Sequence, residues 1–195
     1  DYDVAGRETL SKDIFGVTLA TSYNEMGLVD TVLESGRDTK DRTNKYTYDE
    51  FGRLISESHT GLYKTTYEYD NKDRLVKTTQ KDRVTTNTYD LLDRTKTTTD
   101  ALGNVTSYEY DAVGNAVKEI TTPFDGTAAR EISYDYDFNG NLISTAYPNG
   151  TVISQKYDKD GRRIEEGDGK GNVTKYEFDK AGNVVAITDR LGNRS

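Results

Sequence analysis

The chain has 195 residues, the length of one domain or a short repeat array, and a net charge of only −8. Leu, Ile, Val and Phe number 38, too few for a conventional core by the roughly 20% criterion, while 15 Tyr and the small net charge argue against disorder. The acidic balance argues against nucleic-acid binding, the lack of any apolar run near 18 residues against membrane insertion, and the absence of Cys against disulfides and thiol chemistry.

A repeat of about 21 residues dominates the chain. An aromatic residue, usually followed by Asp, recurs with Gly or Asp four positions later, at separations of 20 to 26 residues. The nine aromatic positions are Tyr2, Tyr23, Tyr48, Tyr69, Tyr89, Tyr110, Tyr136, Tyr157 and Phe178. This repeat predicts a single array of about nine units over residues 1–195, with no separate catalytic domain.

The Asp-x-x-Gly segment of each unit predicts a tight turn. Its Asp side chain is suited to accept a hydrogen bond from the backbone two residues on, and its fourth residue is expected at a positive φ, which Gly adopts without steric cost. Asp73 and Asp93 replace this Gly in two units, and Asp is among the few side chains that tolerate such a φ. We therefore expect a type I turn with a G1 bulge joining two antiparallel strands.

A second set of turns follows the first by 9 to 12 residues, so that each unit holds two turns and two strands of about six residues. The second turns are centred on Gly16, Gly61, Asp82, Gly103, Gly126, Gly150, Gly171 and Gly192. The intervening segments are rich in Thr, Val, Ile and Tyr, which favour strands. The fold class predicted is all-β, an array of consecutive antiparallel hairpins.

Alternation within the strands places the aromatic residues on one face. In the segment VTSYEY, Thr106, Tyr108 and Tyr110 share a side of the strand, and VTKYEF repeats the pattern. Because every unit carries its aromatic residues in the same place, neighbouring strands are expected to set ring beside ring in an aromatic ladder. The framework residues of this ladder are Tyr48, Tyr69, Tyr110, Tyr136 and Tyr157.

Two places in the chain depart from the regular spacing. The separations of 25 and 26 residues fall around residues 36–44 and 122–131, and both stretches are hydrophilic. They are predicted to be extended surface loops.

The repeated motif resembles a known family. Tyr-Asp followed by x-x-Gly-Arg or x-x-Gly-Asn, as in YDEFGRL, YDAVGNA and YDKDGRR, is similar to the YD repeat of bacterial Rhs proteins, wall-associated polymorphic toxins, Tc-toxin shells and animal teneurins. The resemblance covers essentially the whole chain, and together with the absence of Cys it favours a fragment of a bacterial protein. It implies a β-sheet strip that spirals into a hollow shell, secreted or at the cell surface, which in many members encloses a C-terminal toxin domain. Members that release their cargo carry a self-cleavage region with Asp-Pro, which this chain lacks, so neither cleavage nor a toxin domain is assigned to it.

The polar residues of the repeat are candidates for a site. Paired carboxylates could serve hydrolysis, but catalytic sites are singular whereas these recur with the turn, so a structural role is predicted for them. The set is Asp49, Asp70, Asp90, Asp111, Asp137, Asp158 and Asp179. An Arg follows the turn at Arg53, Arg74, Arg94 and Arg162. These Arg residues are expected to be solvated or paired, with binding of an anion by their column as the alternative.

Other candidate sites carry weaker signals. His59 is the only His, sits in a turn-like SHTGLY segment, and has no identifiable partner for catalysis or metal binding. Residues 135–140 imitate the start of a calcium loop, but position twelve is Ala146 where a bidentate Glu is required. The glycine-rich GDGKGN segment lacks the GK[ST] motif of a phosphate-binding loop. No catalytic, cofactor or metal residue is therefore predicted.

Three functional hypotheses follow. The leading one is a non-catalytic wall segment of a YD-repeat shell, whose partners are further YD repeats and an enclosed polypeptide such as a toxin domain. The alternative is an adhesion module that binds a cell-surface glycan through exposed Tyr such as Tyr63 and Tyr147. The third, a hydrolase, would need one of the turn carboxylates to be catalytic.

Overall fold

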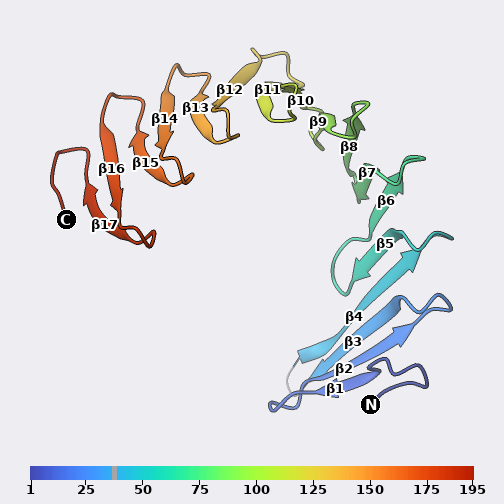
Figure 1. Cartoon of the computed structure of the whole chain (residues 1–195). Coiled ribbons are helices and arrows are strands. Elements are labelled where there is room, and N and C mark those ends of the chain that lie inside the picture. The colour runs from blue at the N-terminus through green and yellow to red at the C-terminus, as the bar shows by residue number, and fades with distance from the viewer. Residues whose placement is uncertain (37–38) are drawn as a thin grey trace. The chain divides into compact units, whose positions relative to one another are not determined.

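The computed structural model describes residues 1–36 and 39–195, and every regular element in these ranges is a β-strand (Figure 1). The first eight strands are β1 (Leu10–Lys12), β2 (Thr18–Tyr23), β3 (Val29–Gly36), β4 (Thr39–Tyr48), β5 (Leu54–His59), β6 (Thr65–Tyr69), β7 (Leu75–Gln80) and β8 (Arg83–Tyr89). The other nine are β9 (Thr95–Thr99), β10 (Val105–Tyr110), β11 (Ala116–Thr122), β12 (Arg130–Tyr136), β13 (Leu142–Ala146), β14 (Val152–Tyr157), β15 (Arg163–Gly167), β16 (Val173–Phe178) and β17 (Val184–Thr188). The all-β prediction is confirmed. The described ranges hold no helix with the length and apolarity needed to cross a bilayer.

The chain divides into two compact units built from the same hairpins. One comprises Asp1–Asn87 with Asp100–Leu102, and the other Thr88–Thr99 with Gly103–Ser195. In the first unit each strand from β1 to β8 pairs antiparallel with the next. In the second unit the same holds from β9 to β17. Each unit is thus a meander of hairpins, as the repeat predicts.

The Asp-x-x-Gly turns have the predicted geometry. In the turn between β4 and β5, the Gly52 N–H donates to the Asp49 carbonyl at 3.0 Å, and the Asp49 N–H donates to the Arg53 carbonyl at 3.0 Å. Gly52 has a φ of 81°, and the residues that replace this Gly elsewhere, Asp73 and Asp93, have φ values of 64° and 63°. The fourth position therefore requires a left-handed backbone in every such turn, which explains its restriction to Gly and Asp.

Seven of these hairpins also carry a bulge next to their aromatic residue. Thr47 opposes Ser56 whereas Tyr48 opposes Leu54, so the following strand has one extra residue at this point. The same shift occurs beside Tyr23, Tyr69, Tyr110, Tyr136, Tyr157 and Phe178. The bulge is therefore part of the repeat, and it keeps every aromatic residue in the same place relative to its turn.

The second set of turns also joins strands, with one correction. Gly16, Gly61, Gly103, Gly126, Gly150, Gly171 and Gly192 have φ values between 77° and 88°. In the remaining turn the residue at positive φ is Lys81, at 54°, rather than the predicted Asp82. Gln80 pairs directly with Arg83, so this hairpin has a two-residue connection in which the first residue takes the left-handed conformation.

One of the two predicted loops is wrong. Residues 39–44 of the stretch 36–44 belong to β4, where Thr43 opposes Leu33 and Arg42 opposes Glu34. Residues 37–38 of this predicted loop lie outside the described residues. The longer spacing here lengthens β3 and β4 to 8 and 10 residues, since a strand of a sheet with solvated faces does not need apolar composition. At the second place, β11 ends at Thr122 and β12 begins at Arg130, with an irregular connection between them.

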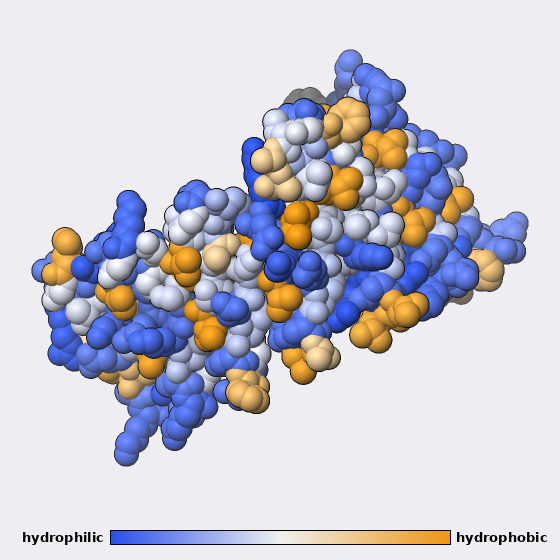
Figure 2. Space-filling view, turned by 90° about the horizontal axis from the view of Figure 1, so that it is seen from above, coloured by the Kyte–Doolittle hydropathy of each residue, from blue (hydrophilic) through white to orange (hydrophobic). Residues whose placement is uncertain are grey.

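The hairpins bury few side chains completely. Among the described residues the buried side chains are those of Ala186, Ser56, Thr65 and Thr145, and no large side chain is fully enclosed. The predicted alternation is present in β16, where Thr174, Tyr176 and Phe178 are half-buried and their neighbours are exposed. On the face shown in Figure 2, apolar side chains form small separate groups among polar ones. Stability must therefore come from contacts within and between hairpins rather than from an enclosed core.

Replacing a turn glycine tests the backbone requirement. Gly161 has a φ of 79°, and a methyl group added at its Cα would meet no atom within 4 Å, so Gly161→Ala introduces backbone strain without a clash. We expect a loss of about 1–2 kcal/mol in unfolding free energy. Lys159→Ala in the same turn is the control and should change stability little, because Lys159 is exposed. Equal urea midpoints for the two variants would contradict the assignment.

Candidate functional site: the Tyr-Asp hairpins

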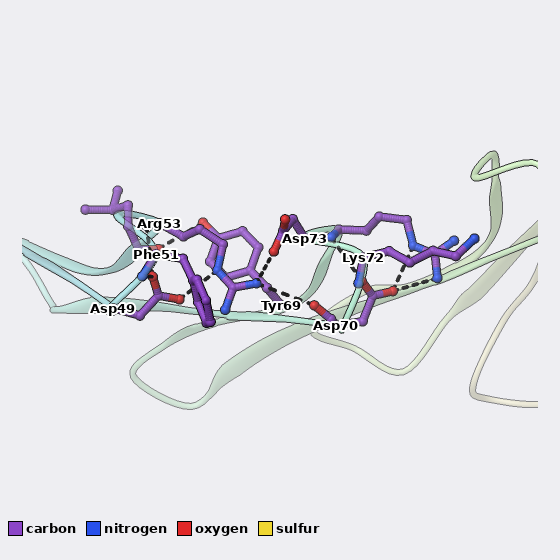
Figure 3. Close-up of polar contacts among 9 residues, drawn as sticks. Asp49, Phe51, Arg53, Tyr69, Asp70, Lys72 and Asp73 are labelled. Atoms are coloured by element: carbon purple, nitrogen blue, oxygen red, sulfur yellow. Dashed lines mark hydrogen bonds and ion pairs between the residues drawn. The ribbon is translucent and has the colours of Figure 1, made fainter.

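The carboxylate of the repeated Asp holds its own turn together. In the turn after β4, Asp49 Oδ1 accepts hydrogen bonds from the backbone N–H groups of Phe51 and Arg53, both at 3.0 Å. Its Oδ2 accepts from Arg53 Nε at 2.6 Å (Figure 3). One side chain thus satisfies two backbone donors of the turn and pairs with the cation just before the next strand.

The same arrangement recurs in the other Asp residues singled out in the sequence. Asp70, Asp90 and Asp158 pair with Arg74, Arg94 and Arg162. Asp111, Asp137 and Asp179 instead accept hydrogen bonds from the side-chain amides of Asn115, Asn141 and Asn183 at 2.9 to 3.0 Å. All seven carboxylates are engaged by backbone N–H groups of their own turns. Their recurrence therefore follows from turn geometry, as predicted.

The Arg side chains also reach the next hairpin. Nη1 of Arg53 donates to the Asp70 carbonyl at 3.5 Å, and the equivalent bonds from Arg94 to Asp111 and from Arg162 to Asp179 measure 3.4 and 3.2 Å. Arg53 also pairs with the Asp73 carboxylate at 2.5 Å (Figure 3). The predicted pairing of these Arg residues is thus confirmed. The alternative of an anion-binding column loses its basis, because carboxylates already neutralise the guanidinium groups.

The same guanidinium groups lie over aromatic rings. The Cζ atom of Arg53 is 5.1 Å from the centre of the Tyr69 ring. The corresponding distance is 4.4 Å for Arg94 over Tyr110, 5.0 Å for Arg162 over Phe178 and 4.4 Å for Arg7 over Tyr23. These are cation–π distances, so each such Arg links its own turn to the aromatic residue of the next unit.

The Tyr hydroxyls make a second link between successive units. Tyr69 donates to the Leu54 carbonyl at 2.9 Å, and Tyr110 donates to the Thr95 carbonyl at 2.7 Å. Tyr23, Tyr48 and Tyr136 donate in the same way to the carbonyls of Glu8, Val29 and Ala116. In every case the acceptor is the sixth residue after the aromatic position of the preceding unit. Tyr157 differs, because its hydroxyl donates to Gln155 Oε1.

The predicted ring-beside-ring ladder is wrong. Each unit contributes two strands, so equivalent aromatic residues lie two strands apart, about 9–10 Å at the usual strand spacing. That exceeds the roughly 4.5–7 Å at which rings interact. Arg guanidinium groups lie on these rings instead. The sequence carried the signal for this contact, since Arg occupies the fifth position after the aromatic residue in five of the units.

The environment of the turns lowers the pKa of their carboxyl groups. The Arg74 guanidinium and the backbone N–H groups of Arg74 and Lys72, opposed by partial desolvation, lower the pKa of Asp70 to about 2. The side-chain amide of Asn141 and the turn N–H groups lower the pKa of Asp137. Desolvation and the hydrogen bond to Glu57 together raise the pKa of Tyr67 to about 12. The Asp residues are therefore anions at neutral pH, and the phenol of Tyr67 remains a donor.

The other candidate residues have structural partners. His59 is the last residue of β5 and also the first residue of the following turn, because its carbonyl accepts from the Leu62 N–H at 2.9 Å, and its Nδ1 lies 2.8 Å from Asn44 Oδ1. Asp137, in the calcium-like segment, uses its carboxylate within its own turn. Asp168, in GDGKGN, accepts from the N–H groups of Lys170 and Asn172, so this segment is another Asp turn. Over the described residues, no three His, Asp or Glu side chains are grouped to hold a metal ion.

Truncating an aromatic link tests its contribution. Tyr110→Ala removes the ring beneath Arg94 and the hydrogen bond to Thr95, and should cost about 2–4 kcal/mol of unfolding free energy. Tyr110→Phe removes only the hydrogen bond and should cost about 1 kcal/mol. Tyr63→Ala, at an exposed residue, is the control. Thermal melts in which Tyr110→Ala matches the parent would refute this role for the ring.

The lowered carboxyl pKa values predict acid sensitivity. Because the pKa of Asp70 is lower in the folded chain, its stabilising contribution is present above about pH 4 and is lost as the pH falls toward about 2. The melting temperature should therefore be flat from pH 7 to 5 and decline from pH 4 to 2. Asp70→Asn should keep the fold, as Asn24 does at an equivalent turn, and make the decline shallower. A melting temperature constant down to pH 2 would contradict this account.

Comparisons with known proteins agree with these hairpins. The profile of the family described as Teneurin YD-shell matches residues 9–194. The search of curated proteins gave no match. The fold is similar to the crystal structure of TcdB2-TccC3-Cdc42, with a TM-score of 0.80 and 19% identity over 96% of this chain and 11% of that chain. It is equally similar to a Tc holotoxin pore of Photorhabdus luminescens, with a TM-score of 0.81 and 20% identity over 96% of this chain and 11% of that one.

The two kinds of match carry different information. At 19–20% identity the structural likeness concerns the fold, and the chain spans only 11% of the length of those proteins. The family profile, in contrast, covers nearly every residue in which the Tyr-Asp hairpins recur. The chain therefore belongs to the teneurin YD-shell family.

Proposed function

We propose that this chain is a non-catalytic wall segment of a YD-repeat shell that encloses or presents another polypeptide. The observation that carries the proposal is the pair of links between successive hairpins, the Tyr hydroxyl on a backbone carbonyl and the Arg on the next ring. Such links extend a sheet by addition of further identical hairpins and need no second layer to cover a core. The partners are accordingly further YD repeats and an enclosed chain such as a toxin domain.

The names of the similar structures support this proposal. They describe TcdB2-TccC3 assemblies and a Tc holotoxin pore, and this chain aligns with 11% of the matched chain in each. A role in a secreted or surface-exposed toxin assembly fits the family and the absence of Cys in the chain. Catalysis is not part of the proposed role, because the recurring carboxylates serve their turns.

A protease-protection assay tests the wall function. In a polypeptide that carries this segment with further YD repeats, non-repeat sequence inside the shell should resist added protease. Combining Tyr110→Ala with Tyr136→Ala, which removes two inter-hairpin links, should raise its cleavage rate about tenfold or more. Tyr63→Ala is the matched control, because that ring is exposed and its hydroxyl has no backbone carbonyl partner among the described residues. Cleavage that is equally fast in the parent and the double variant would contradict enclosure.

An adhesion role is the second candidate, and one observation favours it. Tyr63 exposes 58% of its surface, with Lys81 Nζ 4.8 Å from its ring centre, and an exposed ring of this kind can stack on a sugar. Binding of the chain to a glycan array that is lost in Tyr63→Ala would support adhesion. Binding that is absent, or unchanged by this substitution, would argue against it.

A further inference from the structure

A pocket of about 440 Å³ lies between two successive Asp turns of the second unit. It is bounded by Asp111, Val113 and Asn115 from the turn between β10 and β11, and by Tyr136, Asp137 and Phe138 from the turn between β12 and β13. Its wall thus combines carboxylates with an aromatic ring and apolar side chains. The equivalent positions in other hairpins show which chemical group binds between two such turns.

In three other Tyr-Asp hairpins the equivalent place is filled by an Arg of the chain. The Arg94 guanidinium, for example, pairs with Asp90 at 2.7 Å, donates to the Asp111 carbonyl at 3.4 Å and lies 4.4 Å from the centre of the Tyr110 ring. Arg53 and Arg162 make the same three kinds of contact. A carboxylate, a carbonyl and a ring face therefore define a guanidinium site inside the repeat.

At this pocket the carboxylate, the carbonyl and the ring face are all present, but Asn115 stands where the other hairpins have Arg. Tyr136 is seated as in the other units, because its hydroxyl donates to the Ala116 carbonyl at 3.0 Å, as Tyr110 donates to Thr95. Asn115 Nδ2 donates to Asp111 Oδ2 at 2.9 Å, and this shorter side chain stops there. Within the described part of the chain, no cationic side chain lies over the Tyr136 ring or pairs with Asp111.

We propose that this pocket binds the guanidinium group of an arginine presented by a partner polypeptide. Asp111 Oδ2 would accept one N–H, the Asp137 carbonyl another, and the Tyr136 ring would face the planar cation. The exposed Val113 and Phe138 side chains lie where the aliphatic part of an Arg would pass. A carboxylate oxygen accepts more than one hydrogen bond, so Asn115 does not exhaust Asp111.

Electrostatics favour this occupant. Asp111 keeps a negative charge at neutral pH, since its pKa is lowered against desolvation by the Asn115 amide and the turn N–H groups. A net charge of −8 also attracts cations to the chain. Arg is favoured over Lys because its planar fork reaches a carboxylate and a carbonyl while stacking on a ring, as it does in the neighbouring hairpins.

The test is titration of the 195-residue chain with short peptides, followed by backbone amide NMR. The probes are acetyl-Gly-Arg-Gly-amide, the same peptide with neutral citrulline, and the same peptide with Lys. We expect saturable shifts at residues 111–117 and 136–140 with the Arg peptide, and binding weaker by about tenfold or more with citrulline. Free argininamide distinguishes a small guanidino ligand from a peptide partner. If argininamide binds much more weakly than the Arg peptide, the ligand is an arginine within a polypeptide.

Two variants make the proposal falsifiable on the protein side. Asn115→Arg should fill the pocket with the chain's own guanidinium, abolish peptide binding and raise the melting temperature. Asn183→Arg is the matched control and should leave peptide binding unchanged, because Asn183 pairs with Asp179 in the turn between β16 and β17, outside the pocket. Asp111→Asn should weaken binding by about tenfold or more while keeping the turn, as Asn24 does in its own turn.

The outcomes that overturn the proposal are distinct from failure of the shell function. Equal binding of Arg and citrulline peptides, shifts that map elsewhere, or unchanged binding in Asp111→Asn would each refute the guanidinium site. If Asn115→Arg does not fold, peptide binding by Asp111→Asn still tests the guanidinium site. None of these measurements depends on whether the chain encloses another polypeptide.

Discussion

In eight of the nine units, the hairpin that follows the aromatic residue depends on one ionised carboxylate, and Asn24 takes its place in the other unit. This Asp accepts hydrogen bonds from two or more backbone N–H groups of its turn and from the side chain of the residue just before the next strand. Without it, the turn would leave these donors to solvent and the Arg without an anchor. The Asp thereby holds the Arg so that its Nη1 donates to a backbone carbonyl of the next turn. Its guanidinium plane then lies over the aromatic ring of the next unit. Local turn chemistry and contact between units are therefore coupled through a single side chain.

This coupling explains how the hairpins do without an enclosed core. Few described side chains are buried, and the aromatic residues are only half-covered. A half-buried Tyr contributes less by burial than a core residue, but the hydroxyls of Tyr23, Tyr69 and Tyr110 also donate to a backbone carbonyl, and their rings receive a cation on one face. Because these contacts join each unit to the next, stability is shared along the array, as in other repeat proteins.

Irregular spacing is absorbed without losing these contacts. The 26-residue separation between Tyr110 and Tyr136 enters the connection between β11 and β12, yet Tyr136 still reaches the carbonyl of Ala116. The 25-residue separation between Tyr23 and Tyr48 is taken up by longer strands, and Tyr48 still reaches Val29. The residue that follows the turn varies between units. Where it is Asn115, the short side chain does not reach the Tyr136 ring, and a pocket remains beside that ring.

The all-β class, the hairpin repeat and the Asp turns could be predicted from the residues alone, because each of these follows from local rules on φ, side-chain reach and alternation. Asp73 and Asp93 at the glycine position were sufficient to indicate a left-handed residue. The extension of β4 through residues 39–44, and the carbonyl acceptors of the tyrosine hydroxyls, became visible only in the folded chain. Strand composition is a poor guide where both faces meet solvent, and a ring's partner depends on which residues lie two strands away, a distance that local sequence does not encode.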